Sequence, residues 1–119
     1  NQRLVGKVTL VAHGNTDGFR IGTDWISRKN LHRHEEAFKR MGLLMLPSLA
    51  KLELYSCEVG QNRSLLRRIS ALLGGAKVEA YKQSQPATGE SKGRRVVCGI
   101  STCKVFNPRK RKKRFQWSH

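Results

Sequence analysis

The sequence has few acidic residues and no long apolar run. Only 8 Asp and Glu stand against 24 Lys and Arg, which gives a formal net charge of +16. No stretch approaches the roughly 18–20 consecutive apolar residues of a transmembrane helix, and no signal-peptide pattern is visible. We therefore expect no transmembrane segment. The excess of positive charge is typical of proteins that meet nucleic acid, an anionic membrane surface or an acidic partner.

Cysteine is scarce, and its odd count argues against a framework in which every cysteine is paired. The three residues are Cys57, Cys98 and Cys103. Cys98 and Cys103 could pair, but an odd separation within one strand would place their side chains on opposite faces of the sheet. We therefore expect three free thiols, which fits a domain that acts in a reducing cytoplasm.

The spacing of ligands for a metal site is also missing. His32 and His34 lie on one predicted helix at a separation that points their rings in different directions. Neither this pair nor Cys98 with Cys103 matches a zinc-binding pattern. The sequence therefore predicts no metal site and no cofactor.

A chain of 119 residues is long enough for one domain with its own apolar core. We assign that domain to residues 1–108 and a basic tail to residues 109–119. Alternating or β-branched apolar segments predict strands at 7–12, 51–56 and 77–81, a hairpin arm at 19–22, and one or two closing strands between 94 and 106.

Two amphipathic helices are expected between these strands. Residues 31–41 and 62–73 carry apolar side chains at helical spacing, with Asn30 as the first cap and Gly74 after the second helix. Alternation of strand and helix predicts an α/β fold with a mainly parallel sheet flanked by helices.

Two of the predicted strands end on reactive side chains. His13 follows strand 7–12, and Cys57 follows strand 51–56. Sites in α/β sheets form beyond the carboxyl ends of the strands, so the two side chains share one edge if their strands are parallel neighbours. A cysteine attacks as the thiolate, and a nearby histidine can take the proton. Each residue also has an ordinary structural interpretation, Cys57 as a core residue and His13 as a turn residue.

The segments LVAHGNTDGFRIG, LELYSCEVG and KVEAYKQSQPATG, separated by helices, resemble the caspase-like cysteine peptidases. The resemblance covers roughly residues 7–89 and is closest to the self-processing protease domains of large bacterial toxins and related bacterial domains with His-Gly and Cys motifs. It implies a three-layer α/β sandwich. It also implies cleavage of a polypeptide substrate by a bacterial toxin or effector domain.

The resemblance also implies roles for individual residues. His13 would be the general base and acid, and Cys57 the nucleophile. The backbone amides of Gly14 and Cys57 would form the oxyanion hole. The pocket for the residue before the scissile bond would be shaped by Tyr81, Gln83 and Ser84.

The tail supports a rival interpretation. Six basic residues run without a break: Arg109, Lys110, Arg111, Lys112, Lys113 and Arg114. Phe115 and Trp117 follow, a mixture that suits phosphate contact and base stacking, although a solvated tail or an import signal explains the run equally well. The alternatives to a peptidase are therefore a small basic toxin domain that cuts RNA or DNA, or a nucleic-acid-binding module without catalysis.

Overall fold

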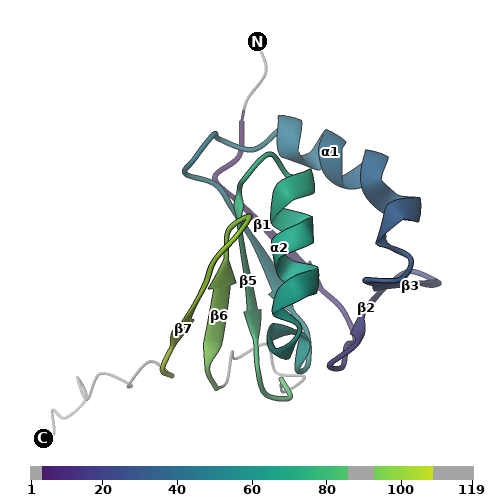
Figure 1. Cartoon of the computed structure of the whole chain (residues 1–119), viewed down its shortest axis with the longest axis vertical. Helices are drawn as coiled ribbons and strands as arrows, with labels where there is room; N and C mark the ends of the chain where they lie inside the picture. The colour runs from purple at the N-terminus through teal and green to yellow at the C-terminus, as the bar shows by residue number, and fades with distance from the viewer. Residues whose placement is uncertain (1–3, 86–92, 109–119) are drawn as a thin grey trace, which may run out of the picture.

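A computed structural model of the chain describes residues 4–85 and 93–108 (Figure 1). The elements follow one another as β1 (Lys7–Val11), β2 (Gly18–Ile21), β3 (Asp24–Ser27), the 3₁₀ helix η1 (Leu31–His34), α1 (Glu35–Leu43), β4 (Lys51–Tyr55), the 3₁₀ helix η2 (Val59–Gln61), α2 (Arg63–Leu72), β5 (Lys77–Tyr81), β6 (Arg95–Cys98) and β7 (Cys103–Phe106). No helix in the described ranges has both the length and the apolar character that a membrane crossing requires.

Five strands form one sheet in the order β1-β4-β5-β6-β7. β1 runs parallel to β4, and β4 runs parallel to β5, whereas β6 and β7 join by antiparallel pairing. The α/β class is confirmed. The sheet is mixed rather than mainly parallel, because only β1, β4 and β5 pair in parallel. The predicted hairpin arm is also present, because β2 pairs with β3 outside the main sheet.

Both helices lie on the same face of the sheet. α2 contacts β5, β6 and α1, and it lies in front of the sheet and runs alongside β5 (Figure 1). Alternate residues of the strands join the helices in one core, which includes Leu52, Leu54, Phe38, Leu65, Leu66, Ile69, Val78, Ala80 and Val96. Burying one such side chain stabilises the fold by about 1.5–3 kcal/mol. The described residues therefore form two layers, and a third layer on the other face is not among them.

The predicted helix boundaries differ at α1. Asn30 does not cap this helix. Its side chain instead accepts a hydrogen bond from the backbone N–H of Ser27 at 2.8 Å, and η1 precedes α1. The observed start of α2 lies within one residue of the predicted start at residue 62. Asn62 caps this helix, because its side chain accepts a hydrogen bond from the N–H of Leu65 at 3.1 Å.

The expectation of three free thiols is wrong, because Cys98 and Cys103 form a disulfide. The argument from an odd separation holds only if one continuous strand carries both residues. In the structure β6 ends at Cys98 and β7 begins at Cys103. The turn between them is closed by a hydrogen bond of 2.9 Å from the N–H of Gly99 to the carbonyl of Thr102. Residues directly opposite in such a hairpin share a face. Cys57 is the free cysteine, and the argument from free thiols for a reducing cytoplasm no longer holds.

The opposite face of the sheet, which the described helices leave uncovered, is rich in charge. We call it the polar face and define it by the strand side chains that point away from the core: Lys7, Thr9, Val11, Lys51, Glu53, Tyr55, Lys77, Glu79, Tyr81, Arg95, Val97, Lys104 and Phe106. Glu53 lies within it, 3.3 Å from Nζ of Lys7, and accepts hydrogen bonds from Tyr81 at 2.8 Å and Thr9 at 3.2 Å.

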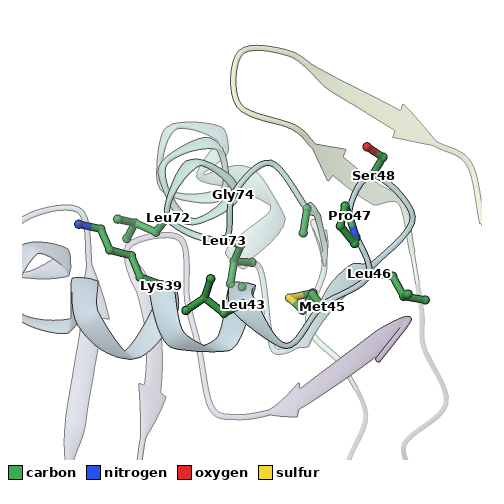
Figure 2. A pocket seen from close by; sticks show the side chains of 11 residues that line it. Lys39, Leu43, Met45, Leu46, Pro47, Ser48, Leu72, Leu73 and Gly74 are labelled. Carbon is green, nitrogen blue, oxygen red and sulfur yellow. The ribbon is translucent and has the colours of Figure 1, made fainter. Parts of the chain in front are cut away.

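The ends of the two α-helices approach each other closely at a groove of about 380 Å³, lined by Leu43, Met45 and Leu73 among others (Figure 2). Gly42 lies at this contact inside α1, one residue beyond the predicted end of the helix at residue 41. A Cβ atom on Gly42 would lie only 2.7 Å from the carbonyl oxygen of Leu73. Glycine costs about 1 kcal/mol in a helix, and the close approach explains its presence.

We expect Gly42→Ala to lower the free energy of unfolding by about 2 kcal/mol, because a methyl group would press against the backbone of Leu73. Helix propensity alone predicts the opposite sign. Chemical denaturation measures the change, and a stabilised variant would show that the two helix ends do not touch in this way.

A second prediction concerns the pH dependence of stability. Burial alone would raise the pKa of Glu53, but the hydrogen bond from Tyr81 and the contacts with Lys7 and Thr9 outweigh it and lower the pKa below its ordinary value near 4.5. A carboxyl group whose pKa is lower in the folded state stabilises the fold at pH values above its ordinary pKa. This stabilisation is lost as the pH falls through the folded pKa. Glu53→Gln should therefore destabilise the protein at neutral pH and much less in acid.

Denaturation curves between about pH 3 and pH 7 test this expectation. Thr9→Val is the milder comparison, since it removes one donor and leaves the carboxylate and Lys7 in place. A gap between wild type and Glu53→Gln that stays constant across this range would contradict the assignment.

Candidate functional site

His13 and Cys57 leave the sheet at the same edge. Val11 of β1 pairs with Tyr55 of β4 in parallel register. The pairing continues for one step, because the N–H of Ala12 donates to the carbonyl of Tyr55 at 3.2 Å. His13 lies two residues after Val11, and Cys57 lies two residues after Tyr55, so each stands just past the carboxyl end of its strand. The structure thus brings together at one edge the two residues that the sequence singled out.

The two strand exits meet at Gly14 and Ser56. A Cβ atom on Gly14 would lie 2.1 Å from Oγ of Ser56 and 2.8 Å from Cγ2 of Val59. Only glycine fits here, and the reason is contact rather than conformation, since Gly14 is not among the residues with positive φ. The contact fixes how closely the segment after His13 approaches the segment that carries Cys57.

A short turn holds the backbone around His13 in place. The carbonyl of His13 accepts the N–H of Arg20 at 2.8 Å, and the N–H of Asn15 donates to the carbonyl of Gly18 at 2.9 Å. The hairpin of β2 and β3 therefore anchors this loop, while the ring of His13 is exposed to solvent. An exposed ring next to the sheet edge is accessible to a bound substrate.

Ser56 carries a buried hydroxyl group without a partner. The residue is 2% exposed, and its Oγ makes no hydrogen bond to the described residues. Leaving such a group unsatisfied costs about 1–3 kcal/mol, and in native proteins it calls for an explanation. The hydroxyl packs against Gly14, so the close approach of the two segments keeps it buried. No motif in the sequence predicts this burial.

Two backbone amides at the edge are also available. Neither the N–H of Gly14 nor that of Cys57 donates to a residue in the described ranges. Unpaired amides at the end of a sheet are suited to bind an oxyanion or a carbonyl oxygen. These are the two donors that the resemblance implied for the oxyanion hole.

The sulfur of Cys57 is half-buried and contacts Gln85. Sγ accepts the backbone N–H of Gln85 at 3.2 Å and lies 3.7 Å from its carbonyl oxygen. The N–H of Glu58 donates to the carbonyl of Gln83 at 3.0 Å, which holds the segment after β5 beside the thiol. Sequence reasoning missed Gln85, which lies one residue beyond the predicted pocket segment and has no motif of its own.

The three predicted pocket residues have different surroundings. Tyr81 is buried on the polar face, where it packs edge-on against Tyr55 with ring centroids 6.1 Å apart. The side chain of Gln83 accepts the N–H of Arg94 at 2.7 Å and so fixes the chain on either side of residues 86–92. Ser84 is exposed. Gln83 and Ser84 thus flank the segment beside Cys57, whereas Tyr81 belongs to the network of Glu53.

The chain turns sharply directly after the cysteine. Glu58 has a φ of 60°, in the left-handed region that non-glycine residues seldom adopt. Such conformations cost about 1–3 kcal/mol and cluster at functional sites. The turn leads into η2, so α2 begins further along the chain and is capped by Asn62 rather than by Cys57. Cys57 therefore does not lie at the N-terminus of α2, where the helix dipole would act on its thiol most strongly.

Other candidate sites can be placed as well. Within residues 4–85 and 93–108, no three His, Cys, Asp or Glu side chains gather in a way that could hold a metal ion. The 380 Å³ groove and a second, apolar pocket of about 260 Å³ between β1, β3 and α1 are lined by residues other than His13 and Cys57. The predicted nucleic-acid contacts at 109–114 lie outside the described residues.

Comparison with known proteins identifies a family for this chain. No curated protein and no solved structure shows significant similarity to it. A family model described as "Domain of unknown function (DUF4347)" matches residues 1–94, which include His13, Cys57 and Gln85 and end just before β6. Because this match spans most of the chain, the protein belongs to the DUF4347 family.

Proposed function

We propose that this domain is a caspase-like cysteine hydrolase that cleaves a peptide bond, with Cys57 as the nucleophile and His13 as the proton carrier. One observation carries the proposal. The parallel register of Val11 with Tyr55 is followed, two residues later on each strand, by a histidine and a half-buried free cysteine.

The reaction would proceed by acyl transfer. The thiolate of Cys57 attacks the carbonyl carbon of the scissile bond, a C–S bond forms, and the π electrons of the carbonyl move to its oxygen. Collapse of this intermediate breaks the C–N bond, and the imidazolium of His13 gives its proton to the leaving amine. Water, deprotonated by His13, then attacks the thioester and releases the acid and the thiol.

The developing negative charge has donors nearby. The amides of Gly14 and Cys57, which have no partner among the described residues, would bind the oxyanion. The hydroxyl of Ser56 packs against Gly14 below this edge and supports the position of the Gly14 amide. The N–H of Gln85 supports the sulfur, since charge-assisted hydrogen bonds are stronger than neutral ones.

The caspase-like assignment rests on connectivity as well as on the two residues. A strand ending in His-Gly, a helical crossover, and a parallel neighbour ending in Ser-Cys reproduce the order of elements that the resemblance implies. The described residues carry helices on one face of the sheet only, so the proposal concerns this order of elements and not a third layer on the polar face.

We expect one thiol to react with iodoacetamide in the native, unreduced protein, because Cys98 and Cys103 are bonded to each other. In a peptide-library assay, Cys57→Ala should abolish cleavage, and His13→Ala should lower the turnover number at least about 100-fold, the usual contribution of a proton carrier. His13→Ala should also slow the alkylation of Cys57.

His32→Ala is the matched control, since His32 is an exposed histidine on η1, away from the sheet edge. It should leave both cleavage and alkylation unchanged. Cleavage that survives Cys57→Ala would overturn the proposal. Hydrolysis of RNA or DNA by the Cys57→Ala variant would favour the nuclease alternative instead.

Gly14→Ala tests the geometry of the edge. Its methyl group would collide with Ser56 and Val59, so we expect a loss of about 1–3 kcal/mol in the free energy of unfolding together with loss of cleavage. Gly6→Ala is the control at the other end of β1, where the nearest atom would lie at an ordinary 3.6 Å. A fully stable and active Gly14→Ala variant would contradict the close approach of the two segments.

A further inference from the structure

Every strand of the sheet places one basic side chain on the polar face. These residues are Lys7 on β1, Lys51 on β4, Lys77 on β5, Arg95 on β6 and Lys104 on β7. The core lies on the other face. The five basic residues share the polar face because side chains alternate between the two faces along each strand. The polar face is therefore a basic surface built from residues far apart in the sequence.

Three of these cations stand in one row. Lys7 is the register partner of Lys51, and Lys51 is the register partner of Lys77. Neighbouring strands lie about 4.8 Å apart, so the three lysines emerge side by side. Like charges directly opposite one another in a sheet are destabilising. Unfavourable pairs of this kind are expected mainly at functional surfaces.

Acidic residues neutralise only part of this charge. Glu53 pairs with Lys7 at 3.3 Å, and the buried Glu79 holds both Lys51 and Arg95 at 3.1 Å. Lys77 and Lys104 are exposed and form no ion pair with any residue in the described ranges. The carboxylates thus orient part of the set and leave the face with a surplus of positive charge.

An aromatic side chain lies next to the cations. Phe106 is 40% exposed, and the guanidinium of Arg95 lies 5.0 Å from the centre of its ring. A sheet face with exposed aromatic and basic side chains is suited to unstacked bases and the phosphates between them. In the sequence, the basic run begins at Arg109, three residues after Phe106.

We propose that the polar face binds single-stranded nucleic acid, with Lys77 and Lys104 contacting phosphates and Phe106 stacking on a base. This binding is separate from the chemistry at Cys57. The surplus charge gives the affinity for phosphate. The exposed ring favours nucleic acid over an acidic polypeptide, which has no bases to stack.

The test is fluorescence anisotropy of the full chain with a labelled single-stranded DNA of about 16 nucleotides, at several salt concentrations. The double variant Lys77→Gln/Lys104→Gln should bind more weakly and reduce the slope of log K against log salt by about 1.4, or about 0.7 for each lost phosphate contact. Thermal unfolding confirms that the variants fold.

Arg63→Gln/Arg68→Gln is the matched control, since it removes the same charge from exposed positions on α2, on the helical side of the sheet. It keeps the basic tail and should bind nearly as wild type. An equal loss in both double variants would show that only overall charge matters and would overturn the proposal.

A second variant separates the classes of partner. Phe106→Leu should weaken binding by about fivefold or more without changing the salt slope, because it removes stacking and no charge. Unchanged binding by Phe106→Leu would overturn the proposal. So would displacement of the DNA by polyglutamate at equal charge concentration, or binding to anionic vesicles with no binding to the oligonucleotide.

Discussion

The contact between Gly14 and Ser56 is the constraint on which the candidate site depends. It exists because β1 and β4 are parallel neighbours in a fixed register, so their carboxyl ends reach the same edge. A shift of β4 by one residue in that register would turn its side chains over and move Leu52 and Leu54 from the core to the polar face. The buried leucines of β4 oppose such a shift, and core packing thereby positions two residues that lie outside the core.

The sheet separates two tasks by the alternation of its side chains. One face supplies apolar residues to the core under α1 and α2. The other carries charged groups, among them Glu79, which is 3% exposed and is held by two cations. Breaking such a buried pair is far costlier than breaking a surface one, so these groups also order the sheet. The proposed hydrolase site lies at the edge between the two faces, and the proposed nucleic-acid surface lies on the second.

Local sequence patterns predict the structure well where the structure itself is local. The leucines of α2 repeat at helical spacing, and the helix lies within one residue of the predicted range. Predictions were wrong or incomplete where distant or turned segments meet. The odd separation of Cys98 and Cys103 predicts free thiols only if one strand holds both, and no local pattern indicates that Gly42 meets the backbone of Leu73.

The sequence by itself determined the α/β class, the main strands and helices, and the two reactive residues at strand ends, because periodicity and residue type act over short stretches of chain. Only the tertiary structure decided that both helices cover one face, that Gln85 contacts the sulfur of Cys57, and that five basic residues share the other face. Those features arise from strand order and register, which are set by packing between residues far apart in the chain.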